Sequence, residues 1–88
     1  MNTAAATSEP KEQRVMMLIT IEGEYVTRLR NAVIKACGKW LEFVRVQPVP
    51  HSTLMRVWLG LGQSAQSAAM RAIVLALPEA EIGRIQAI

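Results

Sequence analysis

The chain has 88 residues, of which 51% are hydrophobic and 19% are charged. This length predicts a single domain, and the composition can supply a hydrophobic core, unlike that of a disordered chain. The ten Lys and Arg residues outnumber the seven Glu residues and give a net charge of +3, a weak indication of an acidic partner such as nucleic acid.

Several classes of protein are excluded at this level. No stretch approaches the roughly 18 apolar residues that a membrane helix needs, and the first fourteen residues lack the apolar segment of a secretion signal. The single cysteine, Cys37, excludes a disulfide within the chain. We therefore expect a cytoplasmic protein that does not contact a membrane. Residues 1–13 are small and polar and predict a flexible tail, so that residues 14–88 form the domain.

The first half of the domain predicts a strand, a helix and a strand. Val15–Ile21 is a short, β-branched, apolar run that stops at a glycine-containing turn, which is typical of a central strand. From residue 24 to residue 37 the apolar residues recur at the helical period, and Gly38 follows as a helix stop. Leu41–Gln47 then alternates between apolar and polar residues, as a strand does.

The second half repeats this order. Residues 54–61 alternate again after a loop that contains Pro48 and Pro50, so that the two alternating runs predict a hairpin whose first strand lies at an edge. Ala65–Leu77 predicts a second helix that ends before Pro78, and Glu81–Ile88 predicts a closing strand.

The order of strand, helix, strand, strand, helix and strand is that of the split β-α-β arrangement, and it predicts an α+β, ferredoxin-like sandwich. We expect an antiparallel sheet of order 4-1-3-2 with both helices on one face. The side chains that face the helices are then Val15, Met17, Ile19, Ile21, Val44, Val46, Met55, Val57, Leu59 and Ile85. The opposite, open face carries Met16, Leu18, Thr20, Leu41, Phe43, Arg45, Leu54, Arg56, Trp58, Ile82, Arg84, Gln86 and Ile88.

This open face is apolar for a surface in water, and such a surface indicates a partner. The leading interpretation is a second copy of the chain, which predicts a homo-oligomer, a dimer or a higher even number. The alternative is single-stranded nucleic acid, with aromatic rings stacking on bases and arginines on phosphates, and a protein adaptor is a third reading. The residues concerned in all three readings are Leu18, Phe43, Arg45, Arg56, Trp58 and Arg84.

The stretch from Leu18 to Val46 resembles an ACT-type regulatory domain, a small ferredoxin-like module that binds amino acids at subunit interfaces. The acidic turn of that family falls on Glu22-Gly23-Glu24-Tyr25, where Glu22 takes the place of the acid and Tyr25 the place of a glycine. After Gly38 the chain has Lys39-Trp40 where the family has an apolar residue and Asn. The resemblance implies a regulatory, ligand-sensing function with a small effector at residues 22–25, where the two glutamates suit an amine better than an anion.

The chain has few residues of the types that usually carry out catalysis. The chain has no Asp, and its one histidine, His51, lies in the hairpin loop without a neighbouring ligand or base. Cys37 falls on the apolar side of the first helix, which predicts a buried, inert thiol. Glu79 and Glu81 form a spaced pair after Pro78 that predicts solvated carboxylates. We therefore expect a non-enzymatic protein without a metal or another cofactor.

Overall fold

The computed structural model describes residues 13–88, so the tail predicted over residues 1–13 lies, apart from its last residue, outside the described part of the chain. Four strands and two α-helices follow one another in the expected order, with a 3-10 turn before each helix and another after the first. Their bounds are β1 Arg14–Glu22, η1 Gly23–Tyr25, α2 Val26–Cys37, η2 Gly38–Trp40, β2 Leu41–Pro48, β3 Leu54–Gly62, η3 Gln63–Ala65, α3 Gln66–Ala76 and β4 Glu81–Ala87.

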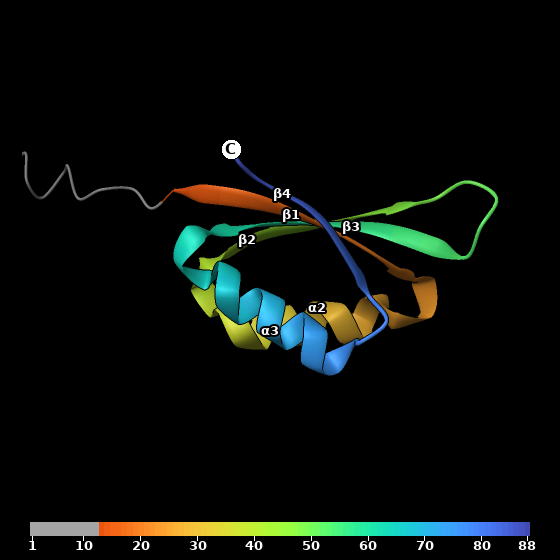
Figure 1. Cartoon of the computed structure of the whole chain (residues 1–88), viewed down its shortest axis with the longest axis horizontal. Helices are drawn as coiled ribbons and strands as arrows, with labels where there is room; N and C mark the ends of the chain where they lie inside the picture. The colour runs from red at the N-terminus through yellow and green to blue at the C-terminus, as the bar shows by residue number, and fades with distance from the viewer. Residues whose placement is uncertain (1–12) are drawn as a thin grey trace, which may run out of the picture.

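The four strands form one sheet in which every neighbouring pair is antiparallel, and both helices lie against the same face of it (Figure 1). The fold is therefore a ferredoxin-like α+β sandwich. The strand order is β2-β3-β1-β4, and counted from the β4 edge the same sheet reads 4-1-3-2. Among residues 13–88, no helix is long and apolar enough to span a membrane.

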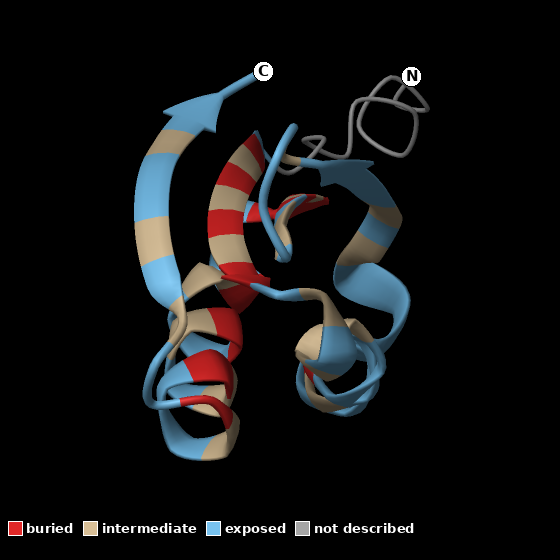
Figure 2. Ribbon diagram, turned by 90° about the vertical axis from the view of Figure 1, so that its right-hand side faces the viewer, coloured by how far each residue is buried: buried red, intermediate tan, exposed pale blue. Residues whose placement is uncertain are grey.

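The core lies between the sheet and the two helices. Along β1, buried side chains alternate with partly exposed ones, as a strand with one covered face requires, and this alternation is visible in Figure 2 on the strand beside β4. Each fully buried Leu, Ile or Met contributes roughly 1.5–3 kcal/mol to folding. The fully buried side chains of largest volume are Met17, Ile19, Leu29, Leu59, Leu61, Ile73, Val33 and Val57.

Two irregularities in the strand pairing overturn two of the predicted orientations. The β2–β3 register shifts between Leu41 and Phe43, and Leu41 lies opposite the buried Leu61. Likewise, the β1–β4 register shifts between Met17 and Ile19, which places Ile82 opposite the buried Ile19. A shift of one residue turns every following side chain to the other face. Leu41 and Ile82 therefore face the helices and pack against the core, and their prediction for the open face was wrong.

The first helix also buries a narrower stripe than its pattern predicts. Leu29, Val33 and Cys37 are buried, whereas Ala36 is exposed. At the end of this helix Gly38 adopts φ +54° and ψ −127°, a backbone conformation that residues with a Cβ rarely adopt. A glycine at this position lets the chain leave α2 and enter the η2 turn that leads to β2.

Candidate functional site

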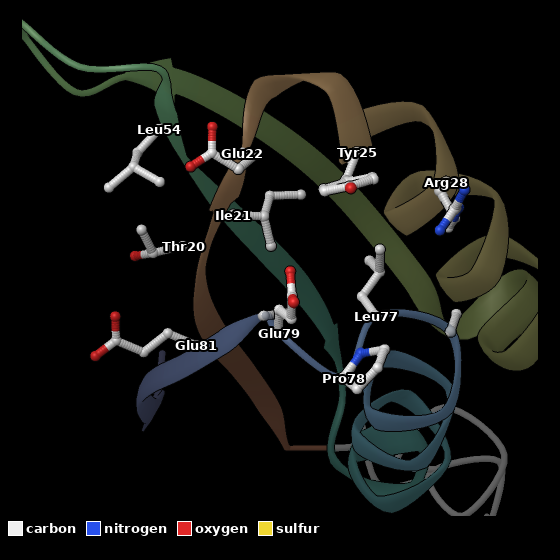
Figure 3. A pocket seen from close by; sticks show the side chains of 12 residues that line it. Thr20, Ile21, Glu22, Tyr25, Arg28, Leu54, Leu77, Pro78, Glu79 and Glu81 are labelled. Atoms are coloured by element: carbon white, nitrogen blue, oxygen red, sulfur yellow. The ribbon is translucent and has the colours of Figure 1, made fainter.

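A cleft of about 410 Å³ opens at the end of β1, between the η1 turn and the loop that joins α3 to β4 (Figure 3). Of the four residues in the predicted ligand turn, Glu22 and Tyr25 line this cleft, whereas Gly23 and Glu24 do not. The full lining is Thr20, Ile21, Glu22, Tyr25, Arg28, Leu54, Ala76, Leu77, Pro78, Glu79, Ala80 and Glu81.

The turn is held in place by the β2–β3 hairpin loop. The Thr53 hydroxyl donates a hydrogen bond to Oε1 of Glu22 at 2.5 Å, and the backbone N–H of Gly23 donates to the carbonyl oxygen of Thr53 at 2.9 Å. A Cβ at Gly23 would lie 3.3 Å from Cε of Met55, so the hairpin leaves little room for a side chain there. The Gly23 N–H is therefore used within the fold, and a side chain at this position would crowd Met55.

Tyr25 and Arg28 form the helix side of the cleft. The guanidinium carbon of Arg28 lies 5.2 Å from the centre of the Tyr25 ring, within the range of a cation–π contact. A hydrogen bond to the Glu24 carboxylate raises the pKa of the Tyr25 hydroxyl above 10.0, and the negative charges of Glu24 and Glu79 act in the same direction. Tyr25 is therefore a neutral hydrogen-bonding group at physiological pH.

Two carboxylates that the sequence pattern predicts to be solvated, those of Glu79 and Glu81, also line the cleft. Glu81 lies opposite Thr20 in the β1–β4 pair, and Glu79 precedes it in the loop. Figure 3 shows the Glu79 side chain pointing from that loop toward Ile21, near the middle of the cleft. The predicted topology could have indicated this placement, because an antiparallel β4 beside β1 brings the start of β4 to the end of β1.

The cleft is acidic although the protein is basic. Three carboxylates line it, against one guanidinium. The one ion pair recorded among residues 13–88 joins Arg14 and Glu42 elsewhere on the surface, at 3.3 Å, so none of the three cleft carboxylates has a cation within 4 Å. Within the same residues, no group of three His, Cys, Asp or Glu side chains lies close enough together to hold a metal ion. The charges of the cleft therefore favour a positively charged group.

The six open-face residues singled out in the sequence come from all four strands and lie together. Trp58 is directly opposite Leu18 on one side and Arg45 on the other. A shallow hollow of about 540 Å³ covers the part of this face formed by β4, β1 and β3. Its lining residues are Met16, Leu18, Arg56, Trp58, Arg84 and Gln86.

The most exposed large apolar side chains lie away from the centre of this face. Leu18, Phe43 and Trp58 are each only partly exposed. The side chains with the larger exposed fractions are Ile34, Trp40, Val46, Val74, Leu75 and Ile88. A second copy of the chain therefore has apolar surface available on the helix layer as well as on the open sheet face.

The two remaining candidates, Cys37 and His51, do not line the cleft. Cys37 is buried, its Sγ lies 3.9 Å from the carbonyl oxygen of Ala65, and burial raises the pKa of its thiol. His51 is exposed in the hairpin loop, at a positive φ of 60°.

No protein-family model matches the sequence, and no curated protein matches it either. The resemblance to the ACT-type domain therefore rests on the stretch from Leu18 to Val46 alone.

Proposed function

We propose that this protein is a non-catalytic, cytoplasmic regulatory module that self-associates and binds a small amine, such as an amino acid, in the cleft at the end of β1. The observation that carries the proposal is the set of three cleft carboxylates, Glu22, Glu79 and Glu81, none of which has a cation from the described residues within ion-pair distance. An ammonium group would supply the missing opposite charge, and hydrogen bonds between charged groups are stronger than neutral ones.

The rest of the lining supports an amino acid as the form of this amine. Arg28 offers a guanidinium to a ligand carboxylate, and the Tyr25 hydroxyl offers a neutral polar contact. Leu54, Leu77 and Pro78 provide apolar surface for a side chain. The volume of about 410 Å³ lies within the range of small-molecule sites.

Self-association is supported by the surface next to the cleft. Val74 and Leu75 are 56% and 76% exposed, and they directly precede the five consecutive cleft-lining residues 76–80 at the end of α3 and in the loop after it. A second copy packed over these two side chains would lie beside the ligand. Ligand binding could then change the strength of assembly, which is the basis of a regulatory readout.

The proposal is tested by titrating isotope-labelled protein with a panel of amino acids while amide chemical shifts are followed by NMR. Each amino acid is paired with the matching carboxylic acid that lacks the amine. We expect the amines alone to shift the amides of Tyr25, Glu79 and Ala80. A panel that moves none of these amides would refute the cleft as a ligand site.

A matched pair of variants isolates the charge. Glu79→Gln removes a cleft carboxylate, whereas Glu42→Gln removes the exposed carboxylate that pairs with Arg14. Loss of one charged hydrogen bond predicts an affinity about tenfold weaker for Glu79→Gln and no change for Glu42→Gln. Equal affinities in the two variants would contradict the electrostatic basis of the proposal. Native mass spectrometry with and without the ligand then reports whether an even-numbered assembly responds to binding.

A further inference from the structure

The open face of the sheet carries two aromatic rings, those of Phe43 and Trp58, which do not line the cleft. Phe43 lies opposite Gly60, and a Cβ built on Gly60 would lie 2.1–2.5 Å from three atoms of the Phe43 ring. Contact of several ring atoms with one backbone position means that the ring lies across Gly60. Trp58 is two residues from Gly60 on the same strand, so both rings occupy the same face of β3 and its neighbour β2.

Three arginines from three different strands surround these rings. Arg45 is directly opposite Trp58, and its guanidinium carbon lies 6.0 Å from the centre of the Phe43 ring. Arg56 is two residues from Trp58 along β3, and Arg84 of β4 lines the same hollow as Trp58. None of these arginines has an ion-pair partner among the described residues.

Among residues 13–88, no carboxylate lines the hollow, and the carboxylates of this face lie at its borders. Glu42 is engaged with Arg14 in the recorded ion pair. Glu22 and Glu81 stand at the end of the face that joins the cleft. The middle of the face is therefore cationic and aromatic, with an acidic border on one side.

This charge distribution favours a polyanion over a second copy of the chain as the partner of the open face. A second copy placed face to face would bring another three arginines to a surface that already holds three, and the repulsion between like charges would be costly. A polyanion would neutralise them. Among polyanions, single-stranded nucleic acid also supplies flat bases that stack on aromatic rings, which is how sheet surfaces bind it without reading much sequence.

We propose that the open sheet face binds single-stranded nucleic acid, with bases on Trp58 and Phe43 and phosphates on Arg45, Arg56 and Arg84. This binding site is separate from the amine cleft and goes beyond the function proposed above. Its occupant differs in charge from that of the cleft, so each proposal can fail without the other.

The test is fluorescence anisotropy of labelled single-stranded RNA and DNA of about 12 nucleotides, a length within the range of known sites. Three phosphate contacts predict a slope of about −2 for the logarithm of affinity against the logarithm of salt concentration. Trp58→Leu and Phe43→Leu keep an apolar residue but remove the ring, and each is expected to weaken binding about tenfold. The double variant Arg56→Gln/Arg84→Gln should reduce the slope to about −0.7.

The matched control is Arg30→Gln/Arg71→Gln, which removes the same charge from exposed positions on the two helices. We expect its affinity and slope to stay close to those of the parent protein. Circular dichroism of each variant verifies folding, and the two ring variants provide independent readings if one of them is unstable.

Three results would overturn the proposal. The first is no binding at low salt. The second is an equal loss in the open-face and control double variants, which would mean attraction by net charge alone. The third is binding of heparin and RNA with equal affinity and no effect of either ring variant, which would indicate a charged surface for a different, acidic partner. A dimer that dissociates when Trp58 is replaced, combined with absent RNA binding, would assign the face to a second copy.

Discussion

Replacing Gly60 by alanine tests whether the Phe43 ring lies on the sheet as described. The new Cβ would stand 2.1 Å from Cε2 and 2.5 Å from Cδ2 and Cζ of Phe43, far inside normal contact distance. The ring must then leave its position, because the backbone beneath it belongs to the buried strand β3. Overpacking of this kind costs about 1–3 kcal/mol, against a gain of roughly 0.5–1 kcal/mol from replacing a strand glycine. The net expectation is a loss of about 1 kcal/mol, between bounds of roughly 0 and 2.5 kcal/mol.

Gly83→Ala, on the edge strand β4, is the matched control. A Cβ there would meet only ordinary contacts, 3.5 Å to the carbonyl oxygen and 3.9 Å to side-chain atoms of Leu18. We expect this variant to be as stable as the parent or more stable by about 0.5 kcal/mol. The two variants thus make the same chemical change with opposite expected signs.

Urea unfolding followed by tryptophan fluorescence and circular dichroism measures both variants. Combining Gly60→Ala with Phe43→Ala completes a double-mutant cycle, and without the ring the added methyl group should no longer destabilise the protein. Equal stabilities of Gly60→Ala and Gly83→Ala would refute the contact between Phe43 and Gly60. So would an unchanged loss of stability when Gly60→Ala is made in the Phe43→Ala variant. Either result would also refute the ring position on which the nucleic-acid proposal depends.

Three further predictions concern the helix end, the cleft and assembly. Gly38→Ala should lower the free energy of unfolding by about 1–2 kcal/mol, because φ is +54° although no atom stands in the way of a Cβ; an unchanged urea midpoint would contradict this. Tyr25 is the one tyrosine of the chain, so alkaline absorbance titration should give a midpoint above 10.0 that falls in Glu24→Gln, where the hydrogen bond and charge that raise the pKa are removed; identical midpoints would show that Glu24 is not the cause. Leu75→Ser should leave stability within about 0.5 kcal/mol of the parent because the side chain is 76% exposed, and light scattering should show weaker self-association, whereas an unchanged assembly would exclude Leu75 from the interface.

The order of elements could be read from the sequence because each one has a clear period or stop signal. The apolar run of Val15–Ile21 became β1, and the helical period of residues 24–37 became η1 and α2. The structure differs mainly at the element ends, where a 3-10 turn precedes each helix. Such a turn has the same apolar spacing as the first turn of an α-helix, so the pattern does not separate the two.

Strand register could not be predicted in the same way. The orientations of Leu41 and Ile82 depend on irregularities that become defined only when β2 and β4 pair with their neighbours. The contact between Phe43 and Gly60 has the same origin, since nothing local in either strand indicates that they lie opposite each other. The sequence pattern indicated one side of the cleft, the turn with Glu22 and Tyr25. It did not indicate Glu79, which comes from a distant loop that the topology brings to the cleft.

The two proposed sites share β1, and this fixes how they could influence each other. Thr20 lines the amine cleft, and Leu18, two residues away on the same face, lines the open-face hollow. Exposed charges are screened over about 10 Å at ordinary ionic strength, so the carboxylates of the cleft act weakly on the distant Arg45 and more strongly on residues near the shared end of the face. An amine in the cleft would neutralise Glu22 and Glu81 and thereby remove the acidic border that repels phosphates. It should therefore strengthen oligonucleotide binding, and by thermodynamic reciprocity the oligonucleotide must strengthen binding of the amine by the same factor.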